Sequence, residues 1–222
     1  NRFLQNKFSG HLVYHCRDTS ILNPDNFDSD SIKTKLGLKG KRVVMFLGTP
    51  RAHKGMEELF MAIEKIKDPS IRLVLIGADS SIQSYVDKMK SNQDRAVIFP
   101  KIPFKDLPQH LSVADILVIP QRDTTDTQGQ IPAKLFDAMS MAKPIITTPL
   151  SDIEEVLGGY GYLIDPSNPD QLAKTIEYIF ANPEEARLKG LNARKRCQEL
   201  YDIKVLKKEL NLQIEKLTTT NS

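Results

Sequence analysis

The sequence lacks the features that mark several large protein classes. Its only two cysteines, Cys16 and Cys197, lie far apart, and no C-x-x-C pair or Cys/His cluster occurs. The sequence therefore implies neither a zinc site nor a disulfide framework, and a reducing cytoplasm is the default expectation. No run of about 18 apolar residues is present that could cross a membrane. The polar start, residues 1–9, has no apolar segment of the kind found in signal peptides.

Charge and histidine content argue against three further kinds of site: a nucleic-acid interface, a hydrolase triad and a metal centre. The net charge is only +3, and the lysines and arginines are mixed with acids, so we expect no nucleic-acid partner. No Ser/His/Asp or Cys/His combination in a useful order supports a hydrolase triad. The histidines are not spaced like metal ligands, so we expect no metal site; they are His11, His15, His53 and His110.

What is present is a regular alternation of two patterns. The 222 residues, 40% of them hydrophobic, can bury the core of one large α/β domain. Short continuous apolar runs predict strands buried on both faces, and the segments between them have helical spacing. This order predicts a Rossmann-like, doubly wound parallel sheet with helices on both faces. The expected strands are 43–47, 73–77, 96–99, 116–119, 144–147 and 162–164, and the expected helices between them are 56–66, 82–89, 105–113, 132–141 and 153–157.

The remaining segments suggest how the chain is organised. Residues 1–41 are polar and irregular and predict a connector with a short helix near 31–36, before a domain over 42–201. Asn168-Pro169 and Asn182-Pro183 each predict a helix start. A C-terminal helix is expected over 202–222, with Leu206, Leu210, Ile214 and Leu217 on one face and a frayed end at 218–220. Because the chain begins at Asn1 rather than at methionine, we expect a fragment, with processing as the alternative.

The loop after the first strand is a candidate diphosphate site. Gly48 lets the backbone approach a ligand, the helix that follows Gly55 offers free N–H groups to an anion, and Arg51 and Lys54 add two cations. The Lys54 side chain is expected to be exposed. Neither G-x-G-x-x-G nor a Walker A loop is present. The local pattern is equally compatible with a plain strand-to-helix turn whose cations are solvated.

Two further segments are candidates on the same edge of the sheet. A flexible polar stretch, 122–130, precedes a helix opened by Pro132, and Asp137 lies in an apolar context within that helix. A buried carboxylate needs a partner: ribose hydroxyls would serve, and the alternative is a structural ion pair with Lys134. After the third strand, the backbone of Ile102 could hydrogen-bond a base, or the segment could simply be a rigid loop. Asp79-Ser80-Ser81, after the second strand, predict a helix start.

Four segments, taken together in this order, resemble glycosyltransferase family 4 of the GT-B fold, over about residues 42–201. The turn at 48–55 resembles the family's G-R…K-G segment, and A-D-I-L-V-I-P resembles its a-D-v-x-v-x-P strand. I-P-A-K-L-F-D-A-M-S-M-A-K-P-I-I resembles P-x-K-L-F-E-x-M-A-x-G-K-P-V-I, with Ala142 at the glycine position. The fourth segment, 158–173, resembles G-x-G-x-L-V-x-P-x-D-P-x-x-L-A.

The resemblance implies roles for individual residues. Lys54, and Arg51 in place of an arginine that normally follows the glycine, would hold the donor diphosphate. Asp137 falls where the family has its ribose-binding glutamate. Eight positions earlier, where the family has another glutamate, this chain has Gly129, which leaves the backbone of Gly129, Gln130 and Ile131 as donors to sugar and phosphate.

The resemblance also implies a chemistry. Family members transfer a sugar from a nucleotide donor, such as a UDP- or GDP-sugar, with retention of anomeric configuration and without a metal. The catalytic histidine and the acceptor site, for a glycan, lipid or small molecule, would belong to an absent N-terminal domain. Peripheral membrane association of the full protein is compatible with this. Two other interpretations stay open: a nucleotide-sugar epimerase on the same fold, and a non-catalytic nucleotide-sugar-binding module, which the missing glutamate favours.

Overall fold

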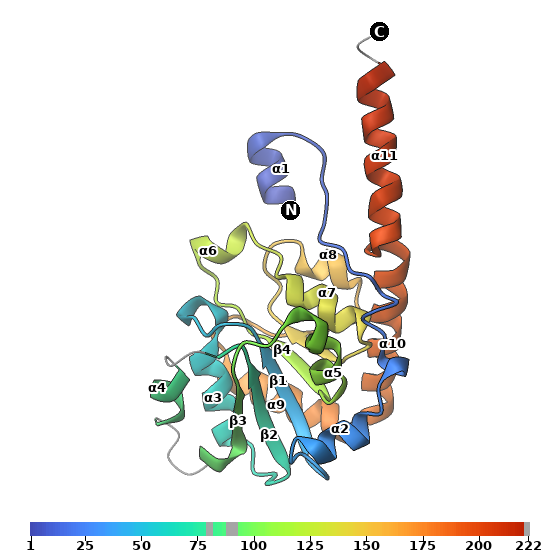
Figure 1. Ribbon diagram of the computed structural model, residues 1–222. Helices are drawn as coiled ribbons and strands as arrows, with labels where there is room; N and C mark the ends of the chain where they lie inside the picture. Colours follow the sequence, from blue (N-terminus) through green and yellow to red (C-terminus); the bar gives the residue numbers. More distant parts are fainter. Residues whose placement is uncertain (79–81, 88–92, 220–222) are drawn as a thin grey trace.

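The fold is a six-stranded, wholly parallel sheet between two layers of helices (Figure 1). The computed structural model describes residues 1–78, 82–87 and 93–219. The strand order is β3-β2-β1-β4-β5-β6, which confirms the predicted doubly wound sheet. The strands are β1 (Arg42–Leu47), β2 (Ile71–Ile76), β3 (Ala96–Phe99), β4 (Ile116–Ile119), β5 (Ile145–Thr147) and β6 (Tyr162–Leu163).

Side chains on the two faces of the sheet enter separate cores. Val43 and Met45 of β1 lie in one core, whereas Val44 and Phe46 lie in the other, because successive residues of a strand point to opposite faces. The first core is covered by α2 (Ser29–Lys35), α5 (Leu107–Ser112), α7 (Ala133–Ser140), α8 (Ile153–Leu157) and part of α10 (Pro183–Leu200). The second is covered by α3 (Met56–Lys65), α4 (Gln83–Val86) and α9 (Pro169–Ala181).

The segment before β1 packs against the sheet domain through two buried leucines. Leu22 and Leu38 are each 1% exposed and belong to the first core. The predicted short helix is present as α2, and an additional helix, α1 (Arg2–Phe8), was not predicted. The long C-terminal helix α11 (Ile203–Thr219) projects away from the body (Figure 1). Its apolar face is therefore not buried: Leu210 and Ile214 are exposed.

Two local expectations need correction. The polar stretch after β4 is not irregular throughout, because Thr124 and Thr127 form a capping box that starts α6 (Thr125–Gln128). The helices α9 and α10 start at Pro169 and Pro183 as predicted; the Asn168 side chain caps α9, whereas the Asn182 side chain donates to the Tyr178 carbonyl. Pro132 precedes α7 instead of opening it. The expected helix start at 79–81 and the last two residues, 88–89, of the helix expected over 82–89 lie outside the described residues.

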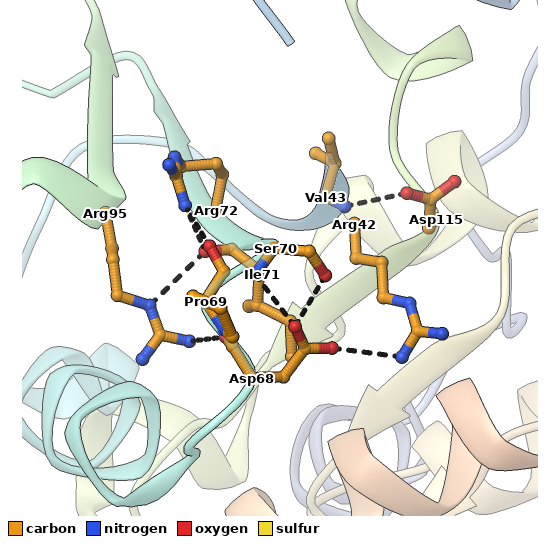
Figure 2. Close-up of polar contacts among 9 residues, drawn as sticks. All are labelled: Arg42, Val43, Asp68, Pro69, Ser70, Ile71, Arg72, Arg95 and Asp115. Carbon is orange, nitrogen blue, oxygen red and sulfur yellow. Dashed lines mark hydrogen bonds and ion pairs between the residues drawn. The ribbon is translucent and has the colours of Figure 1, made fainter. Parts of the chain in front are cut away.

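The amino edge of the sheet carries a dense set of paired polar groups (Figure 2). Arg42 donates to Asp68 at 3.0 Å, and Asp68 in turn accepts from the hydroxyl and backbone N–H of Ser70. Asp115 accepts from the backbone N–H of Val43 at 2.7 Å. The buried guanidinium of Arg95 donates to main-chain carbonyls there, including that of Ile71. These contacts join the starts of β1 and β2 to the loop before β4.

Candidate functional site

The carboxyl ends of β1 and β4 form the point where the strand order reverses, and doubly wound sheets bind ligands there. Gly48 follows β1 with a φ of 117°, which favours glycine. Gly77 follows β2, and a Cβ added to it would lie 3.5 Å from the Gly48 Cα. The first two strand-end loops therefore touch through backbone.

The turn from β1 to α3 packs tightly on the end of β4. Gly55 has a φ of 72°, and an added Cβ would lie 1.8 Å from the Pro120 carbonyl oxygen, so only glycine fits at this position. Lys54 is half-buried rather than exposed as expected, and its Nζ donates to the Thr49 carbonyl at 2.9 Å. Burial, and then the charge of Arg51, lower the pKa of Lys54. Arg51 itself is exposed, and its guanidinium donates to the Pro50 carbonyl.

The segment after β4 is anchored to this turn at Arg122, the first residue of the stretch expected to be flexible. Arg122 donates to Glu58 at 2.6 Å and to Glu57 at 2.9 Å. Its backbone N–H also donates to the His53 carbonyl. Arg122 therefore holds the loop after β1 and the loop after β4 together, because it links the first turn of α3 to the segment that leads into α6.

Lys134, in the first turn of α7, does not form the ion pair with Asp137 that the sequence suggested as an alternative. Its Nζ has no hydrogen-bond partner in the described part of the chain and lies 4.2 Å from the centre of the Phe46 ring. Burial, and then the charge of Lys54, lower the pKa of Lys134 to about 7. The turn after β1 and the start of α7 thus bring two lysines together.

Asp137 is buried, as its apolar context predicted, but its partner comes from far away in the sequence. Arg17 Nε donates to Asp137 Oδ1, and the same guanidinium donates to the carbonyls of Cys16 and Ala133. Burial raises the pKa of Asp137, and the ion pair with Arg17 offsets part of that rise. Nothing in the local sequence around α7 indicated Arg17, which lies 120 positions earlier.

The other predicted site residues also lie along this edge. Gly129, Gln130 and Ile131 connect α6 to α7 and line a cleft of about 460 Å³, together with His15. Ile102 is half-buried in the loop after β3, against the first core. This loop adjoins β2, because the Gly77 N–H donates to the carbonyls of Phe99 and Pro100.

Buried polar atoms without partners are concentrated at the carboxyl edge. Within the described residues, four such side-chain atoms occur: Glu58 Oε2, Gln121 Oε1, Lys134 Nζ and Thr148 Oγ1. Gln121 and Thr148 follow the ends of β4 and β5, and Glu58 and Lys134 lie in the first turns of α3 and α7. Burying a polar atom without a hydrogen bond costs about 1–3 kcal/mol. All four atoms lie at the same edge of the sheet, where a polar ligand could supply the missing hydrogen bonds.

In the described part of the chain, no group of three or more His, Cys, Asp or Glu side chains could hold a metal ion. No helix there is long and apolar enough to span a membrane.

Comparison with known proteins identifies the family. The model of the family "Glycosyl transferases group 1" matches residues 41–182. The chain belongs to this family. Spore coat protein SA of Bacillus subtilis is 26% identical over 202 residues, which cover 85% of this chain and 52% of that protein. The chain thus spans about half the length of the curated relatives it matches.

Solved structures agree with the fold. Sucrose-phosphate synthase from Thermosynechococcus elongatus superposes with a TM-score of 0.81 at 21% identity, covering 99% of this chain and 56% of that one. The Anabaena protein Alr3699/HepE, in its complex with UDP-glucose, superposes with a TM-score of 0.80 at 16% identity, covering 93% of this chain and 57% of that one. This group 1 glycosyltransferase chain therefore has the Rossmann-like architecture of a GT-B C-terminal domain.

Proposed function

We propose that this chain is the donor-binding half of a retaining glycosyltransferase. It takes a nucleoside diphosphate sugar, such as a UDP- or GDP-sugar, at the carboxyl edge of the sheet. A preceding domain would bind the acceptor, a glycan, lipid or small molecule, and would supply the catalytic histidine. Family membership and the UDP-glucose held by a protein of the same fold support this proposal.

The observation that carries the proposal is the uncompensated polar character of one edge. Lys54 and Arg51 bring positive charge to the turn after β1, and the four unpartnered polar atoms belong to residues at strand ends or in first helical turns of the same edge. A diphosphate would supply negative charge and acceptors to the lysines and to the Thr148 hydroxyl, whereas the unpartnered oxygens of Glu58 and Gln121 are acceptors and would need donors such as sugar hydroxyls. Each charge-assisted hydrogen bond to it is worth about 1.5–3 kcal/mol.

The remaining roles follow from position along the same edge. The backbone of Gly129, Gln130 and Ile131, at the start of α7, would donate to sugar and phosphate. The backbone of Ile102 would contact the base, and Gly48 would let the diphosphate approach. Asp137 would accept from the ribose hydroxyls through a carboxylate that Arg17 already orients. This role requires the ribose to reach a side chain that is only 6% exposed.

Calorimetric titration of the 222-residue chain with UDP-glucose and GDP-mannose tests the proposal. One of them should bind, and Lys54→Ala should weaken that binding roughly tenfold to a hundredfold. Lys39→Ala, an exposed lysine in the turn before β1, is the matched control and should bind like the wild type. The chain alone should transfer no sugar to an acceptor. Turnover by the chain alone, or unchanged affinity in Lys54→Ala, would contradict the assignment.

A further inference from the structure

Lys134 is held in surroundings that disfavour its charge on three counts. Its Nζ is buried without a hydrogen-bond partner in the described chain. It lies close enough to Lys54 for that charge to act on it. It is also the second residue of α7, where the free N–H groups of a helix start create positive potential. The face of the Phe46 ring, whose centre lies 4.2 Å from Nζ, offers a favourable contact.

The acids of the adjacent helix turns do not neutralise Lys134, since burial and the charge of Lys54 are what shift its pKa. Asp137, one turn further along α7, pairs with Arg17. Glu58, in the first turn of α3, accepts from Arg122 through Oε1. An anion between the turn after β1 and the start of α7 would therefore meet Lys54 and Lys134 together. It would also meet the N–H groups at the start of α7, whose cap, Pro132, makes no side-chain hydrogen bond.

We propose that Lys134 is a third cation of the donor diphosphate site, and that it becomes an ammonium when the diphosphate binds, so that donor binding takes up a proton. The inference rests on the proposed function and names a residue and a regulation of the same site. A nucleoside diphosphate sugar suits the site because its diphosphate is a diester with two fixed negative charges. The ligand itself does not titrate near neutrality, so the proton must come to the protein.

The proton balance of donor binding follows from the charge state of Lys134. Free protein at pH 8 holds Lys134 mainly as the amine, since its pKa is about 7. The bound diphosphate stabilises the ammonium, which takes one proton from the buffer. Linkage then predicts uptake of ~0.9 proton per donor bound at pH 8, and affinity that weakens up to ~10-fold per pH unit above the pKa of the free amine.

Calorimetric titration with UDP-glucose or GDP-mannose, in buffers of different ionisation enthalpy at pH 8, measures this uptake. The wild type should take up close to one proton. Lys134→Met should take up none and bind at least ~10-fold more weakly at pH 7. Lys134→Arg keeps a permanent cation, so it should bind without uptake and with little dependence on pH. Lys143→Met, which removes a buried lysine from the opposite edge, should match the wild type in both affinity and uptake.

The outcomes separate this inference from the proposed function. Binding by the wild type with no proton uptake, or binding by Lys134→Met at wild-type strength, would overturn the role of Lys134 and leave the donor site standing. Uptake that persists in Lys134→Met would assign the proton to another group and would also overturn it. If neither nucleotide sugar binds the wild type, the proposed function fails and this inference fails with it.

Discussion

The two edges of the sheet each bury a lysine, and they treat its charge differently. At the amino edge, a pocket of about 490 Å³ is lined by Lys33, Lys41, Arg42, Lys143 and Arg187, around Asp115. Burial lowers the pKa of Lys143 to about 8, and the charge of Asp115 opposes that shift. Lys143 Nζ also donates to the Ser112 carbonyl at 2.7 Å.

Three other cations of that pocket have partners as well. Lys33 donates to both oxygens of Asp115 at 2.8 Å, Arg42 pairs with Asp68 (Figure 2), and Arg187 pairs with Glu184 at 2.7 Å. Lys134 at the carboxyl edge has no such partner in the described chain. A buried lysine therefore does not by itself indicate a binding site, since the protein compensates Lys143 with its own groups. The uncompensated Lys134 is the reason why we propose the donor site at the carboxyl edge.

The largest effect is expected at Asp137, whose ion pair is buried. Asp137→Asn should lower the free energy of unfolding by about 3 kcal/mol or more, because it leaves the Arg17 guanidinium without its carboxylate. Chemical denaturation of the ligand-free protein measures this. If Asp137 also holds ribose, Asp137→Asn should weaken donor binding more than Arg17→Met does at matched fraction folded. Equal affinities in the two variants would leave Asp137 a structural residue and remove the ribose role.

Lys134 should show the opposite sign of effect on stability. Lys134→Met should raise the free energy of unfolding at pH 7 by about 1–4 kcal/mol, because an unpaired buried cation is replaced by an apolar group of similar length. A variant that is more stable but binds donor more weakly is the signature of a functional residue. A loss of stability at pH 7 would instead mean that protein groups compensate Lys134 as they compensate Lys143. The two edges would then not differ in how they hold a buried lysine.

The same residue makes stability depend on pH in a defined window. The pKa of Lys134 is lowered from 10.5 to about 7 on folding, so between these values the unfolded chain binds the proton that the folded chain does not. Stability must then rise with pH from about 7 to about 10. Denaturation series should show this rise in the wild type, and a smaller rise in Lys134→Met. Parallel curves for the two proteins would contradict the lowered pKa.

At the amino edge, removing a partner should cost stability and nothing else. Asp115→Asn weakens the contacts to Lys33 and to the Val43 N–H, and should destabilise the protein by about 2 kcal/mol. Affinity for UDP-glucose or GDP-mannose should stay at the wild-type value, because these contacts lie at the opposite edge of the sheet from the donor site. A clear loss of donor affinity in the folded variant would show that the edges are coupled.

The smallest effect is expected at Ala142, which lines the same amino-edge pocket. Its φ of 52° is in the left-handed region, which L side chains rarely adopt. Ala142→Gly should therefore stabilise the protein slightly, by about 0.5 kcal/mol, since relief of strain is partly offset by greater freedom of the unfolded chain. Thermal denaturation should place the melting temperature of Ala142→Gly slightly above that of the wild type. A lower melting temperature would mean that the methyl group contributes more by packing than it costs in strain.

The fold was largely predictable because its strands are short apolar runs, and the four central ones, β1, β2, β4 and β5, are buried on both faces. Continuous apolar runs located β3 and β4 residue for residue and placed β1 and β5 within one residue. The short helix α6 was missed because its start depends on hydroxyl contacts between Thr124 and Thr127, within a polar stretch that has no apolar periodicity. The left-handed turn at Ala142 did have a signal, since the related motif carries glycine there.

The candidate site was predictable in its loops and less so in its contacts. Strand-end positions pointed to Gly48, Arg51 and Lys54, because parallel strands present their carboxyl ends on one edge. Spacing along a helix suggested Lys134 for Asp137, but the ion pair is made by Arg17 from the segment before β1. Such a contact depends on how distant segments pack, and no local pattern encodes it.

The central claim is that a nucleotide sugar binds at the carboxyl edge and not in the basic pocket of the amino edge. Amide NMR of the labelled 222-residue chain, titrated with UDP-glucose and GDP-mannose, tests it most directly. We expect the largest amide chemical-shift changes at Gly48, Lys54, Gly129 and Ala133, and no change at Asp115 and Lys143. Shifts centred on Asp115 and Lys143, with the carboxyl-edge amides unmoved, would contradict it.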